Sequence, residues 1–354
     1  MSSEVEMLDF EAFKERYEKV PVEEYPNNVR EAVPDPVVSV HLLTYNHADY
    51  IREAIESVLM QEVDFPMEIV LGDDDSSDGT REICIEYAKQ HPDLIRLQLH
   101  HRENNHKLDG TPTHLFQFYY NTFQLRGQYF AVLSGDDYWT DPQKLQKQAD
   151  HLSQNPSCVF VHHPWIPEFK EDEGLSIDAL IQRKRDSGDV RTSSQYLTRM
   201  YRSEAFTFYE ECMGALCEDI FMGCVVRSRG TASFLSDIRP GVYRRHEQGM
   251  WTSEGAISQN RHQIRTCYLL LSIVDEEGVR SDVLDLLNRS MCTLLMEISA
   301  CDDERLHHII WWHVKEAFQT NETQPLLLNQ RFLQCAASSL AQKIKQAWLM
   351  LARD

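Results

Sequence analysis

Acidic side chains gather at three places in this sequence where they could do chemistry. The clusters are Asp73-Asp74-Asp75, Asp136-Asp137 and Glu218-Asp219. Carboxylate oxygens are the ligands that hard divalent cations prefer, and a carboxylate can also remove a proton from a hydroxyl group. These residue types therefore allow a phosphate-bearing ligand to be held through a cation, with a base beside it.

The first cluster continues into Ser76-Ser77-Asp78-Gly79-Thr80, which suits a tight turn at the start of a helix. Asp73 and Asp74 can accept hydrogen bonds from a nucleotide base or a ribose hydroxyl, and the free N–H groups of a helix N-terminus favour anions. An acidic surface turn with a helix cap explains the same residues, and composition alone favours that simpler interpretation.

The second and third clusters suggest metal binding and proton transfer. Asp136 could bind a cation that bridges two phosphates, so that a nucleoside diphosphate departs with its charge neutralised. Asp219 could take the proton of an acceptor hydroxyl, and His246 could be a further metal ligand. Taken singly, the residues are weak evidence: a strand-ending turn, an acidic helix start and a solvated basic loop explain them as well, and for a lone histidine the structural role is favoured.

Alternating strands and helices must position these clusters. Short apolar runs predict strands, and apolar residues at helical spacing predict helices between them. The predicted strands are 37–43, 68–71, 94–99, 129–133 and 158–162, and the predicted helices are 10–20, 51–59, a segment from about 79, 112–125 and 141–154. This alternation implies a mainly parallel sheet, in which ligands bind beyond the carboxyl ends of the strands. The first two clusters follow strand ends, so the pattern places both on one rim.

The chain of 354 residues predicts two domains, or one large domain with an appendage, at ~150 residues per domain. We interpret residues 1–35 as a polar lead-in and residues 36–254 as the α/β domain. Within that domain, 164–205 is predicted to be a polar, loop-rich, variable insertion. Residues 255–354 have apolar residues at helical spacing and predict a helical C-terminal region.

Composition narrows the function further. A formal net charge of -21 repels nucleic-acid phosphates, so we expect no nucleic-acid partner. No apolar run approaches ~18 residues, and the acidic N-terminus lacks the features of a secretory signal. The nine cysteines form no Cys-x-x-Cys pair, which favours reduced thiols in a cytoplasmic protein.

Together, the clusters and their surroundings resemble family 2 glycosyltransferases with the GT-A fold. The resembling segments are Pro36–Asn46, Ile51–Gln61, Ile69–Thr80, Ser134–Asp137, Asp141–Leu145, Glu218-Asp219, Tyr243–His246 and Gly249–Trp251. They occur in the family's order and spacing, which is far more specific than any one motif. The resemblance implies an α/β, Rossmann-like GT-A fold, with a mostly parallel sheet flanked by helices.

The resemblance also implies a role for each site residue. Asp219 would be the general base, and Asp136 with His246 would bind Mn or Mg. The residues expected to contact the nucleotide sugar are Thr44, Tyr45, Asn46, Asp73, Asp74, Asp136 and Asp137. The candidates for acceptor contacts are Trp139, Glu218 and Trp251, although packing is an equally good explanation for the two tryptophans.

Two positions depart from the family pattern. Ser134 replaces the first acidic residue of the usual Asp-x-Asp, which weakens or removes one ribose or metal contact. Asp75 replaces a small residue, and Asp tolerates a positive φ better than most residues if the turn requires one. Arg102 and Lys107 lie where the family often has a cation for the donor, but the local match is poor.

The expected function is that of an inverting hexosyltransferase in polysaccharide biosynthesis. It would move a sugar from a nucleoside diphosphate sugar, with uridine as the expected base, to a glycan or lipid-linked acceptor. A sugar nucleotidyltransferase is the enzymatic alternative, but the loop Thr44–His47 is neither glycine-rich nor basic. A catalytically silent nucleotide-sugar-binding scaffold is the other alternative, and the joint presence of the acidic residues and His246 argues against it. The C-terminal helices leave open a homo-oligomer or a peripheral contact with the inner face of a membrane.

Overall fold

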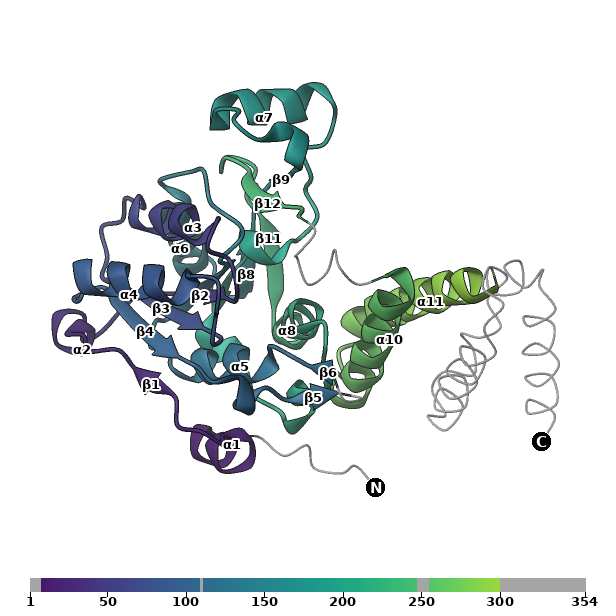
Figure 1. Cartoon of the computed structure of the whole chain (residues 1–354). Helices are drawn as coiled ribbons and strands as arrows, with labels where there is room; N and C mark the ends of the chain where they lie inside the picture. The colour runs from purple at the N-terminus through teal and green to yellow at the C-terminus, as the bar shows by residue number, and fades with distance from the viewer. Residues whose placement is uncertain (1–7, 109–110, 247–254, 300–354) are drawn as a thin grey trace, which may run out of the picture. The chain divides into compact units, whose positions relative to one another are not determined.

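The computed structural model describes residues 8–108, 111–246 and 255–299 of the chain (Figure 1). The chain divides into two compact units. The first consists of Met1–Met213 and Val225–His246, and the second consists of Gly214–Cys224 and Glu247–Asp354. The first unit is the α/β part of the chain and carries the acidic clusters at 73–75 and 136–137.

An eight-stranded sheet forms the centre of the first unit. Its strand order is β1-β4-β3-β2-β7-β10-β8-β11. The four strands β4 (Ile95–Leu99), β3 (Met67–Asp73), β2 (Val38–Thr44) and β7 (Tyr129–Ser134) are parallel to one another. The remaining strands are β1 (Glu23–Glu24), β10 (Met200–Arg202), β8 (Cys158–His162) and β11 (Thr231–Phe234). β1 and β10 run antiparallel to their neighbours, and β11 runs parallel to β8. The prediction of a mostly parallel sheet flanked by helices is confirmed.

The register of the central strands brings the two acidic clusters to the same rim. Thr44 at the end of β2 pairs with Asp73 at the end of β3, and Leu43 pairs with Ser134 at the end of β7. Because these strands are parallel, the loops that follow them leave the sheet at the same edge. The prediction of one rim is therefore confirmed.

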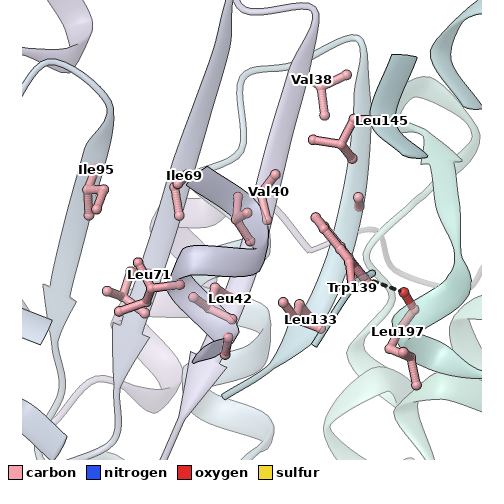
Figure 2. Packing of buried hydrophobic residues seen from close by; sticks show 14 of the residues in the cluster. Val38, Val40, Leu42, Ile69, Leu71, Ile95, Leu133, Trp139, Leu145 and Leu197 are labelled. Carbon is pink, nitrogen blue, oxygen red and sulfur yellow. Dashed lines mark hydrogen bonds between the residues drawn. The ribbon is translucent and has the colours of Figure 1, made fainter. Parts of the chain in front are cut away.

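One face of the sheet is covered by α3 (Ile51–Leu59), α4 (Thr80–Gln90) and α6 (Lys144–Gln154). Alternate apolar residues of the strands, such as Val38, Val40 and Leu42, pack against the buried sides of these helices (Figure 2). Each of these three side chains is fully buried, and burial of a Val or Leu contributes about 1.5–3 kcal/mol. This packing holds the strand ends, and hence the rim, in a fixed register.

Trp139 belongs to the same core. Its side chain is 1% exposed, and its Nε1–H donates a hydrogen bond of 2.8 Å to the carbonyl of Leu197 (Figure 2). The ammonium group of Lys144 lies 3.8 Å from the ring centroid. A ring enclosed in this way offers no face to a sugar, so the structure favours the packing role over an acceptor contact.

The other face of the sheet is covered by α5 (Leu115–Phe123), with α1 (Phe10–Tyr17) against it. Phe118 lies 5.2 Å from His41 of β2, measured between ring centroids. α5 approaches the sheet closely because Gly72 has no side chain: a Cβ there would lie 2.0 Å from Nδ2 of Asn121.

A chain of ion pairs centred on the buried side chains of Arg96 and Glu68 ties the N-terminal lead-in to this second face. Glu24 of β1 accepts hydrogen bonds from Arg96 of β4, whose guanidinium is fully buried. Arg96 also lies 3.6 Å from Glu68 of β3, and Glu68 pairs with Arg126 at 2.6 Å. Burial alone would raise the pKa of Glu24, but Arg96 and neighbouring amides lower it to about 2. The N-terminal lead-in thus contributes the Glu24 carboxylate, which pairs with Arg96 of the sheet.

Two segments differ from the sequence prediction. Residues 164–205, predicted to be loop-rich, contain β9 (Trp165–Glu168), α7 (Ile177–Asp186) and β10, which lies inside the main sheet between β7 and β8. α6 begins at Lys144 and not at Asp141, because the Asp141 carboxylate accepts from the backbone N–H groups of Gln143 and Arg239 and pairs with Lys147.

The second unit is helical where it is described. It contains α10 (Ala256–Ile273), α11 (Glu277–Ser299) and the first turns of α8 (Glu218–Arg227). A helical region after residue 254 is therefore confirmed for residues 255–299. Within the described part of the chain, every helix is too short or too polar to cross a membrane.

Candidate active site

The loop after β2 and the turn after β3 are fastened together by side-chain hydrogen bonds. The N–H of Asn46 donates to Ser76 Oγ at 2.9 Å, and Asn46 Oδ1 accepts from the N–H of Ser77 at 2.9 Å. The N–H of His47 donates to Thr80 Oγ1 at 2.8 Å. The Asn46 side chain therefore braces the two loops, a role that the sequence did not predict.

Left-handed backbone conformations shape these two loops. Asn46 has φ of 52° and Asp75 has φ of 61°. Asn and Asp tolerate this region better than other residues with a Cβ. The departure from a small residue at position 75 thus leaves the turn geometry intact.

The two carboxylates of the β3 turn are buried and have different partners. Asp73 is 0% exposed and pairs with Arg81. Asp74 is 1% exposed, and its Oδ2 accepts from Arg102 at 3.1 Å and from Asn105 at 3.0 Å. Burial raises the pKa of Asp74 to about 6, although Asn105 and Arg102 act in the opposite direction.

Arg102 also stacks on the residue expected to meet the nucleotide. Its guanidinium lies 4.1 Å from the ring centroid of Tyr45. Arg102, Tyr45 and Asp74 therefore form one cluster, in which the guanidinium of Arg102 contacts the acidic turn after β3. The structure pairs Arg102 with Asp74, whereas the Lys107 side chain is exposed.

The second cluster brings together three residues that are distant in the sequence. Asp136 Oδ2 lies 3.1 Å from His246 Nε2 and 3.7 Å from His47 Nε2. Burial would raise the pKa of Asp136, but His47, His246 and a hydrogen bond from Ser134 hold it well below its usual range. Asp136 is therefore ionised at neutral pH. Ser134, which replaces an acidic residue of the family motif, contacts Asp136 instead.

Arg244 holds the backbone of this cluster. Its N–H donates to Asp137 Oδ1 at 3.0 Å, and its guanidinium donates to the Asp136 carbonyl at 3.1 Å. The same guanidinium pairs with Glu168 of β9 at 2.8 Å and with Glu53 of α3. Burial, together with the neighbouring charge of Asp136, raises the pKa of Asp137 well above its usual range.

The donor set suits a divalent cation that a diphosphate would complete. Within the described residues, no three His, Cys, Asp or Glu side chains are grouped to hold a metal. Asp136 and His246 nevertheless supply an ionised carboxylate and an imidazole at 3.1 Å. Mg²⁺ is commonly bound by one or two carboxylates together with substrate phosphates and water. Asp136 fits such a cation as its carboxylate ligand, and His246 is placed to add a nitrogen ligand.

The remaining predicted residues belong to the second unit or fall outside the described residues. Glu218 and Asp219 begin α8, within the segment Gly214–Cys224 of the second unit, and Asp219 Oδ1 accepts from the N–H of Ile220 at 2.7 Å. The role of Asp219 as base stays a prediction. Trp251 lies outside the described residues.

Sequence reasoning missed His47 and the bracing role of Arg244. His47 follows Thr44-Tyr45-Asn46 directly, and Arg244 lies two residues before His246. Only their position beside recognised residues could have pointed to them, because neither residue type is diagnostic of a site. Thr44 contributes its hydroxyl, which lies 3.2 Å from His47 Nδ1.

Part of the chain is similar in sequence to known proteins. Residues 39–212 match the model of the family described as glycosyl transferase family 2. An uncharacterised protein of Mycobacterium tuberculosis is 30% identical over 228 residues, which are 61% of either chain. A putative teichuronic acid biosynthesis glycosyltransferase of Bacillus subtilis is 33% identical over 125 residues, covering 35% of this chain and 45% of that protein. The matched part thus spans less than two thirds of these relatives.

A solved structure shares the fold. The crystal structure of S. aureus TarS 1-349 in complex with UDP-GlcNAc has a TM-score of 0.53 to this chain, with 15% sequence identity and 89% of each chain covered. At this identity the similarity concerns the fold alone.

Proposed function

Because residues 39–212 match glycosyl transferase family 2, we propose that this chain transfers a sugar from a nucleoside diphosphate sugar to an acceptor hydroxyl, with inversion at the anomeric carbon. One observation carries the proposal. Asp136 and His246, 110 residues apart in the sequence, meet on the rim that also holds Asp73 and Asp74. A cation site for a diphosphate and carboxylates for a nucleoside are thereby combined at one sheet edge.

The nucleoside is recognised by the first acidic turn. Asp74 Oδ1 is buried and has no hydrogen-bond partner among the described residues, so it can accept the N–H of a base. Uridine is the proposed base, and a protein of similar fold has been crystallised with UDP-GlcNAc.

Asp136 and His246 are the residues that would hold Mn or Mg beside the diphosphate. Bound there, the cation would neutralise charge on the departing nucleoside diphosphate. Arg244 keeps the backbone carbonyl of Asp136 and the side-chain carboxylate of Asp137 in place by donating a hydrogen bond to each. Asp137 lies beside the sugar in this scheme.

Asp219 accepts the proton of the acceptor hydroxyl as its oxygen attacks the anomeric carbon. The bond between that carbon and the diphosphate oxygen breaks on the opposite side, which gives inversion. Glu218 contacts the acceptor. The acceptor is a glycan or a lipid-linked glycan of polysaccharide biosynthesis, a role supported by the putative teichuronic acid relative. Hexosyl transfer, a cytoplasmic location and association through the C-terminal helices are further parts of the proposal.

The decisive experiment follows nucleotide release. Purified protein with Mn and a panel of nucleoside diphosphate sugars should hydrolyse one donor slowly without an acceptor, and a silent scaffold should hydrolyse none. Incubation with a nucleoside triphosphate and a sugar phosphate should release no pyrophosphate. Pyrophosphate release would instead identify a nucleotidyltransferase and contradict the proposal.

Asp74 should make uridine diphosphate binding pH-dependent. Only the ionised carboxylate accepts freely from a base N–H, so affinity should fall as the pH drops through the Asp74 pKa of about 6. The limiting slope for one proton is about tenfold per pH unit. Calorimetry between about pH 5 and pH 8 measures it, with Asp74→Asn as the control. Because the ligand's own phosphate titrates in both proteins, equal slopes would contradict the role of Asp74.

A further inference from the structure

His47 stands beside the proposed cation site without being one of its expected ligands. Its Nε2 lies 3.7 Å from Asp136 Oδ2, and the rings of His47 and His246 have centroids 6.3 Å apart at 88°. The separation of 3.7 Å is too long for a hydrogen bond. The Asp136 carboxylate is therefore hydrogen-bonded to the imidazole of His246, and the imidazole of His47 lies near it without a hydrogen bond.

Contacts of its backbone and of its Nδ1 atom fix the position of His47. Its N–H is bonded to Thr80 Oγ1, and its carbonyl accepts from the N–H groups of Tyr50 and Ile51 at the start of α3. Its Nδ1 lies 3.2 Å from Thr44 Oγ1. The ring cannot turn away without losing that contact.

The loop that carries Asp136 is pressed against this ring. A Cβ on Gly135 would lie 2.6 Å from Thr44 Oγ1 and 3.0 Å from His47 Nδ1. Real Cβ atoms do not approach so closely, so only glycine allows the loop to lie here. The short distance between His47 and Asp136 is thus built into the fold.

The neighbouring carboxylate determines which ring nitrogen carries a proton. A lone pair facing Asp136 would be repelled, so Nε2 carries a hydrogen whether the imidazole is neutral or charged. This N–H has an anionic neighbour but no hydrogen bond among the described residues. A phosphate oxygen held next to Asp136 is the acceptor that would complete it, because charge-assisted hydrogen bonds are among the strongest.

We propose that His47 is a diphosphate-binding residue, whose Nε2–H donates to a phosphate oxygen of the nucleoside diphosphate independently of the cation. The inference rests on the proposed function, and it adds a contact that survives removal of the metal. It also predicts that the loop after β2 contacts the phosphate as well as the nucleoside.

The test compares uridine diphosphate with uridine monophosphate in EDTA and in Mn, by calorimetry on the full chain. In EDTA, His47→Ala should lower the preference for the diphosphate by about 10- to 100-fold, which is the effect of losing one charge-assisted hydrogen bond. His91→Ala, at the far end of α4, is the matched control and should leave both affinities unchanged. His47→Gln should retain part of the preference, because its amide can still donate.

Two results would overturn the inference in distinguishable ways. If His47→Ala changes the preference only in Mn, the residue acts on the cation site and not on the phosphate. If the unaltered protein does not prefer the diphosphate in either condition, the proposed function fails together with the inference. Circular dichroism of each variant establishes that it is folded.

Discussion

Replacing Asp219 by Asn is expected to lower the turnover of sugar transfer by about 10²–10⁴-fold, the usual contribution of a general base. The amide keeps the size of the side chain and can still accept from the N–H of Ile220, as Asp219 does at 2.7 Å. It cannot take a proton at neutral pH. Donor affinity should therefore remain, and the loss should fall on the chemical step.

The measurement is single-turnover sugar transfer at saturating donor. Glu218→Gln is the matched control, because Glu218 precedes Asp219 at the start of the same helix. It should raise the KM for the acceptor and leave the chemical step within a few-fold of normal. Near-normal turnover of Asp219→Asn would remove Asp219 from the mechanism, and a collapse of Glu218→Gln alone would transfer the role to Glu218.

Replacing Asp136 by Ala is expected to abolish the increase in nucleoside diphosphate affinity that Mn produces. The affinity for the nucleoside diphosphate in Mn should fall by more than about 10–100-fold, which is the usual cost of removing a residue that only orients a metal ligand. The carboxylate is held ionised beside two imidazoles, and these would be left without a partner anion. Binding of the nucleoside alone should change little, since Asp74 lies on a different loop.

Calorimetry with uridine diphosphate, with and without Mn, separates the two contributions. Asp150→Ala on the exposed side of α6 is the control and should retain the Mn effect in full. Should Asp136→Ala respond to Mn as the unaltered protein does, the cation is held elsewhere. A fall in affinity that is equal in Mn and in EDTA would mean that Asp136 only supports the local structure.

The shared rim could be predicted from sequence because it depends on short segments whose residues are adjacent in the chain. Apolar runs of strand length, each followed by an acidic turn, specify parallel strands that end together, and Thr44, Asp73 and Ser134 are found in adjacent registers. The approach of His246 to Asp136 required the resemblance, since no periodicity links residues 110 positions apart. The role of His47 was not predicted, because its contact with Asp136 depends on how close Gly135 lies to Thr44.

Short elements were missed for a different reason. β10 has three residues, Met200–Arg202, and its pattern is too brief to distinguish a strand from a loop. It is a strand because β7 and β8 flank it and satisfy its backbone groups. The same holds for Trp139, whose burial follows from packing against Leu197 and not from its neighbours in the sequence.

The salt-bridged lead-in determines where this protein can be truncated without loss of stability. A truncated version that starts at residue 36, where the strand pattern begins, would lack Glu24 and leave the enclosed guanidinium of Arg96 short of one of its two carboxylates. Because the guanidinium is fully buried, loss of Glu24 should lower the stability of the protein, although Glu68 and the carbonyl of Gln124 still contact Arg96. Minimal versions for crystallography or directed evolution should therefore begin upstream of β1, and N-terminal tags belong before α1.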